Sequence, residues 1–356
     1  MTNKLHSTYR ILDASANRAC EGIRTTEEYA RFVLDDSQLA TDAKAIRHGI
    51  TAALSRLPPG ALLQARDTRA DVGTTIQLPS EYDRQTTSDV LAAAAARVQQ
   101  SLRVLEEYGK TIDAQLGQQF ESLRYQSYSL MQNVLLQSHC HQRVSRINEA
   151  RLYLLIECQS DEASTAKQIE QLAESGVDVF QLRDKQATDR ELYRHATAAA
   201  AATERTNTLL IINDRVDIAA ATNADGVHLG QDELPVSAAR TILGPEKLIG
   251  LSTHDTQQVQ QAIEQGVSYI GCGPTFPSTT KSFSDFAGPQ FLSEAAQLLA
   301  KQNVPAFAIG GITENNLTDV LQTGFERIAV SGAISNSDAP NETAKSLSAQ
   351  LHAVTN

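Results

Sequence analysis

The sequence lacks long hydrophobic runs and an excess of basic residues, and each absence excludes a class of protein. No stretch of its 356 residues approaches the ~20 consecutive apolar residues that a membrane-spanning helix needs. The polar start MTNKLHSTYR does not resemble a signal peptide. A formal net charge of −11 disfavours non-specific nucleic-acid binding. We therefore expect a cytoplasmic protein without nucleic-acid or membrane partners.

Cysteines are few and scattered. They stand at Cys20, Cys140, Cys158 and Cys272. Without CxxC spacing they predict neither a disulfide framework nor a zinc site. The run at residues 139–141 (HCH) has no second ligand pair nearby, and we predict no metal site there.

The length and a change in pattern along the chain predict two domains. At ~150 residues per domain, a chain of this length corresponds to two. Residues 1–145 carry apolar residues at three- and four-residue spacing, which is typical of helices. From Arg151 onward, short β-branched runs alternate with amphipathic helical stretches. We predict an all-α domain over residues 1–145 and an α/β domain over residues 146–356.

The helical part contains an internal repeat. Residues 18–29 (RACEGIRTTEEY) align with residues 97–108 (RVQQSLRVLEEY), matching in both arginines, both glutamates and the tyrosine. The repeat predicts two related helical hairpins that pack together. Its charges form either solvated ion pairs along the helices or a charged pocket between the hairpins, completed by Arg66 and its neighbours. The sequence assigns this domain no function.

The second part predicts a (β/α)₈ (TIM) barrel, because eight short apolar runs alternate with helical stretches. The predicted strands are Leu152–Glu157, Val179–Arg183, Leu209–Asn213, Gly226–Leu229, Leu248–Ser252, Tyr269–Gly273, Ala306–Gly310 and Arg327–Ser331. A doubly wound sheet is the alternative, but it would need a topological switch point that this even rhythm does not suggest.

Polar, charged or glycine-rich groups follow seven consecutive predicted strands, at the rim where such barrels carry their active sites. Arg183 ends the second predicted strand, Lys185 follows it, and Lys281 follows the sixth. Three cations at one rim of an acidic chain predict a polyanionic ligand, most simply a diphosphate.

Acidic and glycine-rich groups at the same rim predict a metal and a second anion site. Asp214 and one of the neighbouring acids Asp232 and Glu233 supply hard oxygen ligands, which suit Mg²⁺ held by protein and substrate together. Gly310–Gly311 and Ser331–Gly332 follow the last two strands, where backbone amides commonly bind phosphate. The rim therefore predicts two anion sites, as two phosphorylated substrates would need.

The motifs QLRDK, IINDR, GVHLGQDE, IGLSTH, GPTFPSTTK and AIGGI, in this order, resemble those of thiamine phosphate synthases. The resemblance covers about residues 150–350 and implies a (β/α)₈ fold. It also implies coupling of 4-amino-2-methyl-5-pyrimidinylmethyl diphosphate to 4-methyl-5-(2-phosphoethyl)thiazole, or its carboxylated form, to give thiamine phosphate and diphosphate. The helical part resembles an extension fused to this enzyme in some bacteria.

The resemblance also implies residue roles. Catalytic roles fall to Arg183, Lys185, Ser252 and Lys281. Pyrimidine diphosphate binding falls to Gln181, Leu182, Arg183, Asp184, Lys185, Asn213, Ser252 and Lys281. Thiazole phosphate binding falls to Ser278, Thr279, Thr280, Gly311, Ser331 and Gly332. Mg²⁺ is assigned to Asp214 and Glu233. The family usually has aspartate where Glu233 stands, which keeps Asp232 open as the second ligand.

Two alternatives stay open beside the synthase. A thiazole tautomerase-like barrel would need the neutral phosphate site but neither the cations nor the metal. A non-catalytic thiamine-precursor-binding protein would not need an intact set of leaving-group residues. The three cations together with Asn213 and Asp214 favour the synthase. A chain starting near Val144 is expected to keep the activity if it folds, since all six motifs follow that position. The sequence leaves homo-oligomerisation open.

Overall fold

The computed structural model describes residues 3–69, 71–72, 84–277 and 287–353. The chain divides into two compact units, Met1–His141 and Gln142–Asn356. This division and the predicted boundary after residue 145 both fall within helix α5 (Ala114–Glu149). None of the helices in the described ranges has the length and apolar character needed to cross a membrane.

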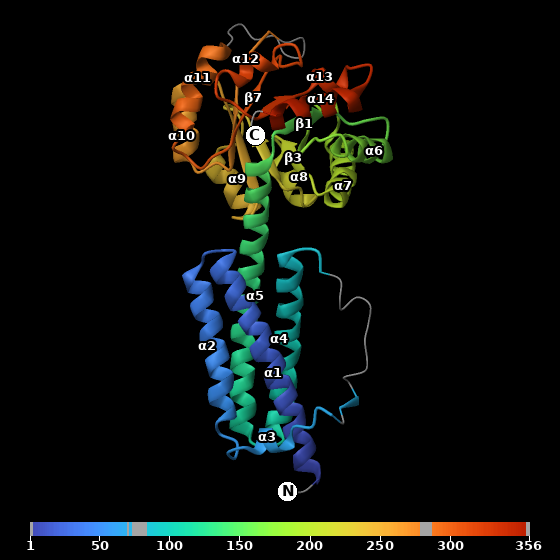
Figure 1. Ribbon diagram of the computed structural model, residues 1–356. Coiled ribbons are helices and arrows are strands. Elements are labelled where there is room, and N and C mark those ends of the chain that lie inside the picture. Colours follow the sequence, from blue (N-terminus) through green and yellow to red (C-terminus); the bar gives the residue numbers. More distant parts are fainter. Residues whose placement is uncertain (1–2, 70, 73–83, 278–286, 354–356) are drawn as a thin grey trace. The chain divides into compact units, whose positions relative to one another are not determined.

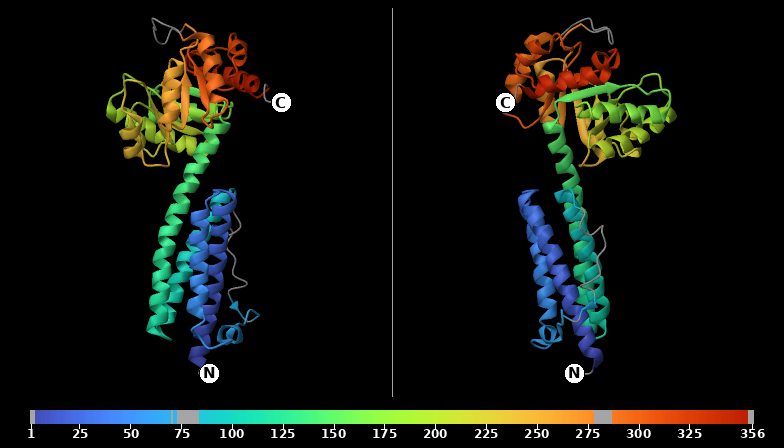
Figure 2. Two further views of the ribbon diagram at one scale, coloured as in Figure 1. Left: turned by 90° about the vertical axis from the view of Figure 1, so that its left-hand side faces the viewer. Right: turned by 45° about the vertical axis from the view of Figure 1, so that its right-hand side comes forward.

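The first unit is helical, as predicted. Its helices are α1 (Asn3–Phe32), α2 (Ser37–Leu54), α3 (Ala61–Ala65), α4 (Thr87–Lys110) and the first part of α5. Short links at residues 33–36 and 111–113 make α1–α2 and α4–α5 antiparallel hairpins that lie side by side (Figure 2). Gly22 lets α1 approach α4 closely, because a Cβ there would lie 2.7 Å from Cγ2 of Val98.

In the first hairpin, the repeated motif forms a buried ion-pair cluster. Glu27 is 4% exposed, and its carboxylate accepts hydrogen bonds from Arg24 at 3.3 Å and from Arg47 of α2 at 3.1 Å. Arg66, which the pocket hypothesis included, instead forms a bidentate pair with Asp13 at 2.7 and 2.8 Å. These charged groups therefore form ion pairs with one another. Arg24 and Glu27 pair within α1, whereas Arg47 and Arg66 pair with acidic residues of a different element.

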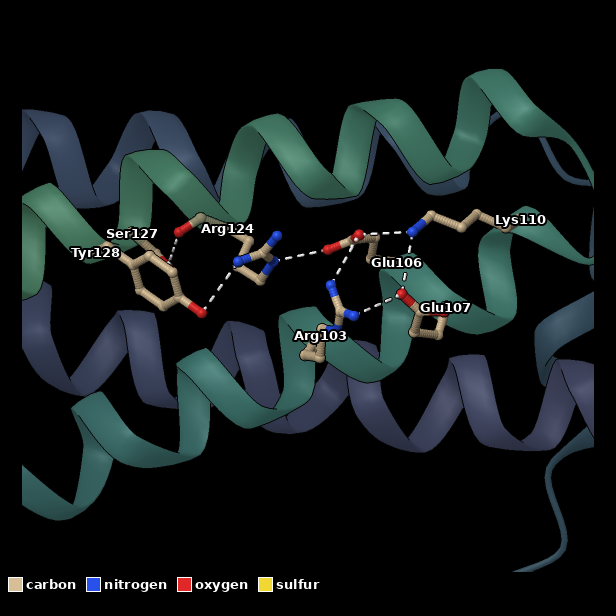
Figure 3. Close-up of polar contacts among 7 residues, drawn as sticks. All are labelled: Arg103, Glu106, Glu107, Lys110, Arg124, Ser127 and Tyr128. Atoms are coloured by element: carbon tan, nitrogen blue, oxygen red, sulfur yellow. Dashed lines mark hydrogen bonds and ion pairs between the residues drawn. The ribbon is translucent and has the colours of Figure 1, made fainter.

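The second hairpin repeats this cluster. Glu106 is 1% exposed and accepts hydrogen bonds from Arg103, Lys110 and, across the hairpin, Arg124 of α5 (Figure 3). Tyr128 accepts a further hydrogen bond from Arg124 at 3.1 Å. In both hairpins a buried glutamate binds the arginine three positions earlier and an arginine of the second helix.

Within the described part of the second unit, eight parallel strands close into a barrel in the order β1 to β8 (Figure 1). The strands are β1 (Leu152–Ile156), β2 (Val179–Leu182), β3 (Leu209–Asn213), β4 (Gly226–Leu229), β5 (Leu248–Thr253), β6 (Tyr269–Cys272), β7 (Ala306–Ile309) and β8 (Ile328–Val330). The predicted (β/α)₈ barrel after a helical region is therefore confirmed, and the doubly wound alternative is wrong because the sheet is closed.

Helices cover the outside of the barrel (Figure 1). They are α6 (Glu162–Ala173), α7 (Asp189–Thr206), α8 (Val216–Ala221), α9 (Val236–Leu243), α10 (Thr256–Glu264), α11 (Gly288–Leu299), α12 (Leu317–Leu321), α13 (Gly332–Ser335) and α14 (Pro340–Ala353). Several begin at side-chain caps that satisfy otherwise unpaired backbone amides. Thr188 and Glu191, for example, form a capping box at the start of α7.

Side chains on successive strand residues alternate between the two faces of the barrel wall. Outward-facing residues such as Leu154 and Phe180 pack against the helices. Inward-facing residues form a separate interior cluster that includes Tyr153, Tyr269 and Phe307. Ile147, near the end of α5, belongs to this interior cluster and is fully buried. The last residues of α5 are thus part of the barrel unit.

Candidate active site

A cavity of about 500 Å³ opens where the barrel strands end. Its walls come from inward-facing strand residues, such as Tyr153 and Tyr269, and from residues at or just after the carboxyl ends of the strands. The volume lies within the range of ~300–1,000 Å³ typical of small-molecule sites. The predicted rim of polar groups therefore surrounds a real cavity.

Ten of the residues to which the resemblance assigns roles line this cavity. They are Gln181, Arg183, Lys185, Asn213, Asp214, Glu233, Ser252, Gly311, Ser331 and Gly332. They come from different strands, and the closed barrel brings them to one place. Cations, carboxylates, amides and hydroxyls are all represented.

Two other predicted site residues, Leu182 and Asp184, do not line the cavity. Leu182 is fully buried and packs with the outer core between barrel and helices, so its side chain does not reach the cavity. Asp184 accepts hydrogen bonds from the backbone N–H groups of Cys158, Gln186 and Ala187, and thereby fixes the loops after β1 and β2. Burial tends to raise the pKa of Asp184, but these backbone hydrogen bonds bring it below its usual value. The predicted residues Ser278, Thr279, Thr280 and Lys281 lie outside the described residues.

Asp214 sits directly after β3 in a left-handed backbone conformation, with φ of 59°. Its N–H donates to the carbonyl oxygen of His228 at 2.9 Å, which ties the turn to β4. The amide of Asn213 donates to the Asp214 carboxylate at 2.6 Å. The backbone and a neighbour thus hold this carboxylate at the cavity wall.

The second acid of the metal hypothesis can be located in the turn after β4. Glu233 lines the cavity, whereas Asp232 is exposed and does not line it. No group of three or more His, Cys, Asp or Glu side chains able to hold a metal occurs among the described residues. Two carboxylates at a cavity wall nevertheless fit Mg²⁺, which proteins often bind through one or two carboxylates together with substrate phosphates.

The loop after β7 brings backbone close to the cavity. Gly311 has a φ of +65°, and a Cβ there would lie 2.6 Å from the carbonyl oxygen of Pro277 and 2.7 Å from that of Phe276. Asn316 fixes this loop by donating to the carbonyl oxygen of Gly311 at 2.9 Å and accepting from the N–H of Thr313 at 2.8 Å. Only glycine fits at position 311.

Comparison with known proteins identifies the family. A family model described as thiamine monophosphate synthase matches residues 152–334. A thiamine-phosphate synthase of Rhodopirellula baltica is 47% identical over 348 residues, covering 97% of this chain and 93% of the relative. The chain belongs to the thiamine-phosphate synthase family.

Further comparisons agree with this assignment. A thiamine-phosphate synthase of Nostoc sp. is 40% identical over 346 residues, covering 97% of this chain and 95% of the relative. A solved thiamine phosphate pyrophosphorylase from Pyrococcus furiosus is 28% identical, with a TM-score of 0.51, and covers 59% of this chain and 99% of that one. The chain is a transferase of thiamine biosynthesis, as the sequence motifs predicted.

The helical unit has a separate match. A model described as the ThiD2 family matches residues 10–133. The thiamine-phosphate synthases of Rhodopirellula baltica and Nostoc sp. align over nearly the whole chain, so they share the helical part as well.

Sequence reasoning assigned no functional role to an inner set of polar residues in this thiamine-phosphate synthase family member. His228, Tyr153 and Tyr269 line the cavity, and they are hydrogen-bonded to one another or to predicted site residues. Burial, helped by the charge of Arg183, lowers the pKa of His228 to about 4, so its imidazole is neutral at neutral pH. Tyrosines at inward-facing positions of otherwise apolar strands were the signal that could have revealed this set.

Proposed function

We propose that the cavity transfers the pyrimidinylmethyl group of 4-amino-2-methyl-5-pyrimidinylmethyl diphosphate to the nitrogen of 4-methyl-5-(2-phosphoethyl)thiazole, or of its carboxylated form. One observation carries the proposal. Cations and carboxylates (Arg183, Lys185, Asp214 and Glu233) line the same cavity as the glycine-rich loops at Gly311 and Gly332. Two phosphorylated substrates that react with each other need two such anion sites within one cavity.

Arg183 and Lys185 would bind the diphosphate, because a guanidinium and an ammonium suit phosphate oxygens. Lys281 is the third cation of this proposal. Gln181, Asn213 and Ser252 would bind the pyrimidine, and the backbone around Gly311 and Ser331–Gly332 would bind the thiazole phosphate, together with residues 278–280.

Asp214 and Glu233 would hold Mg²⁺ against the diphosphate. When bound, Mg²⁺ supplies positive charge that stabilises the departing diphosphate. Asn213 supports this role for Asp214, since its amide orients the carboxylate at 2.6 Å.

The proposed reaction needs no protein nucleophile. The bond between the methylene carbon and the diphosphate oxygen breaks, and its electron pair leaves with the diphosphate. The aminopyrimidine ring carries the positive charge until the thiazole nitrogen donates its lone pair to form the new C–N bond. With the carboxylated thiazole, the bond to the carboxyl carbon also breaks, CO₂ leaves, and the electron pair that remains on the ring carbon takes up a proton from solvent. Arg183 and Lys185 then contribute electrostatic stabilisation of the leaving group. Cys272 is an unsuitable nucleophile, because burial raises the pKa of its thiol to about 12.

A coupling assay with the purified chain tests the proposal. The two substrates with Mg²⁺ should yield thiamine phosphate and diphosphate in equal amounts, measured by product chromatography. Omitting either substrate is the control. Folded protein that forms no thiamine phosphate under these conditions would refute the proposal.

A further inference from the structure

Five side chains form a continuous hydrogen-bonded chain across the interior of the barrel. Gln181 of β2 donates its amide N–H to the hydroxyl of Tyr153 at 2.8 Å. The hydroxyls of Tyr153 and Tyr269 are 3.0 Å apart, and that of Tyr269 lies 3.1 Å from Nδ1 of His228. Nε2 of His228 lies 2.9 Å from Oγ of Ser252. The two ends of the chain, Gln181 and Ser252, both line the cavity.

With the Gln181 amide N–H directed at Tyr153, counting protons gives this chain one direction. A tyrosine hydroxyl has a single proton. Tyr153 accepts from Gln181, so its own proton points to Tyr269, whose proton then points to Nδ1 of His228. Nδ1 is therefore unprotonated, and the neutral imidazole carries its proton on Nε2, which donates to Ser252. Because Ser252 accepts this hydrogen bond, it does not donate its own hydroxyl proton to His228.

The surrounding barrel is built to hold these rings. Tyr153 and Tyr269 are 2% and 0% exposed, and both pack edge-on against Phe307, with ring centroids 5.3 and 5.9 Å away. Gly250 makes room for the ring of Tyr269, because a Cβ there would lie 2.1 Å from it. Burial raises the pKa of both tyrosines well above the usual value, which keeps their hydroxyls protonated.

We propose that Tyr153, Tyr269 and His228 are positioning residues that fix the hydrogen-bond polarity of the pyrimidine site. Ser252 then offers its hydroxyl as a donor, and Gln181 offers its side-chain carbonyl oxygen as an acceptor. An aminopyrimidine edge has the complementary pattern, a ring nitrogen that accepts and an exocyclic amino group that donates. This inference rests on the proposed function for its substrate, but the direction of the chain is a property of the protein alone.

The opposite direction is the competing arrangement. If the Gln181 amide were turned over, every proton in the chain would reverse, and His228 would carry its proton on Nδ1 and accept from Ser252. The tautomer of one histidine therefore separates the two arrangements.

The first test is nitrogen NMR of the full-length protein with ¹⁵N-labelled histidine at neutral pH, without substrates. The resonances that disappear in His228→Gln assign His228. We expect the Nε2–H tautomer, with Nδ1 unprotonated and hydrogen-bonded. An Nδ1–H tautomer or a protonated ring would overturn the proposal, whether or not the protein couples the two substrates.

The second test is kinetic and uses tyrosine-to-phenylalanine variants, which keep the ring. In Tyr269→Phe we expect kcat/KM for the pyrimidine diphosphate to fall about tenfold, the scale of one buried hydrogen bond, with KM for the thiazole phosphate within about twofold. The double variant with Tyr153→Phe should lose little more, because the chain acts as a unit. The matched control is Tyr29→Phe, which removes a buried hydroxyl contact to Ser138 (2.6 Å) in the helical unit and should leave both constants unchanged.

The kinetic outcomes also separate the two proposals. A wild-type protein without coupling activity refutes the proposed function, and the tautomer result still decides the direction of the chain. If the wild type is active but Tyr269→Phe keeps both the tautomer of His228 and kcat/KM for the pyrimidine substrate, the positioning role is overturned. An equal decrease of kcat/KM for both substrates in Tyr269→Phe would overturn the positioning role too, since it indicates a general structural effect.

Discussion

Arg143, near the end of α5, forms a 3.0 Å ion pair with Asp225, directly before β4. The side chains are 14% and 18% exposed, so the pair is largely shielded from water. Asp225 also accepts a hydrogen bond from the backbone N–H of Leu210 in β3. The last residues of α5 therefore help to hold two strands of the barrel.

This ion pair indicates where the shortest chain that still folds into the barrel should begin. We predict that a chain starting at Gln142 keeps coupling activity, because it retains Arg143 and the buried Ile147. A chain starting at Arg151 should unfold or melt far lower, since it loses the interior contact of Ile147 and the ion pair, each worth on the order of 3 kcal/mol. Melting temperature and activity of the two chains check this.

The same ion pair predicts a lower stability for the chain that starts near Val144. That chain would lack Arg143 and should melt between the other two. If a start at Gln142 gives folded protein without activity, the helical unit is required for the reaction.

Asp214 should be indispensable to the metal-assisted step. Asp214→Asn is expected to lower kcat by 10²-fold or more, on the order of the loss of one strong electrostatic contact in the transition state. Asp217→Asn is a matched control, because Asp217 pairs with Arg215 at 2.7 Å and does not line the cavity. Kinetics with and without chelator, followed by added Mg²⁺, measure the effect. Full activity in excess chelator would contradict the metal assignment.

The neighbouring acids Asp232 and Glu233 should behave differently, because only Glu233 lines the cavity. We predict that Glu233→Gln raises the Mg²⁺ concentration needed for half-maximal rate by about tenfold or more, whereas Asp232→Asn changes it little. Glu233→Asp should keep most activity, since Mg²⁺ accepts either carboxylate. If Asp232→Asn raises the required Mg²⁺ concentration and Glu233→Gln does not, the metal ligand is Asp232.

Much of the barrel and its rim could be predicted from the sequence, because both depend on short patterns of neighbouring residues along the chain. Each strand is a short apolar run followed by polar residues, and a closed parallel sheet brings all those endings together. The choice between Asp232 and Glu233 could not be predicted, since in a turn the side chains do not follow strand alternation.

The interior hydrogen-bond chain could not be predicted for a different reason. Tyr153 and Tyr269 are 116 positions apart, and their contact exists only because the barrel closes. Similarly, the repeat in the helical unit predicts ion pairs along one helix, but not the contribution of Arg124 from the next helix. Periodicity detects neighbours within an element, whereas these contacts join different elements.

Gly311 should tolerate no side chain. Gly311→Ala combines left-handed strain of about 1–2 kcal/mol with a collision against the carbonyls of Phe276 and Pro277, so the loop must move. We predict at least a tenfold rise in KM for the thiazole phosphate, the scale of one lost hydrogen bond to a charged group. Gly266→Ala is the matched control, because its φ of +68° carries similar strain but nothing lies within 4 Å. Gly266→Ala should show the stability loss of the strain alone, Gly311→Ala should lose at least as much, and only Gly311→Ala should lose substrate affinity.

Glu106 should govern the acid stability of the helical unit. Burial tends to raise its pKa, but hydrogen bonds from Lys110 and Arg124 and the charge of Arg103 lower it below the usual value (Figure 3). Because the folded pKa is lowered, the stabilisation is complete above the unfolded value of about 4.5 and is lost as the pH falls through the folded one. Chemical unfolding of the helical unit between pH 7 and pH 3 measures this loss.

Substitution at this site isolates the buried carboxylate from its exposed neighbour. Glu106→Gln should destabilise the helical unit by about 3 kcal/mol at pH 7, because it leaves the buried Arg124 without a charged partner, and should flatten the pH dependence. Glu107→Gln is the control, since Glu107 contacts Arg103 and Lys110 but is 47% exposed, and it should cost less than about 1 kcal/mol. Equal losses in the two variants would show that burial of Glu106 does not set the strength of the cluster.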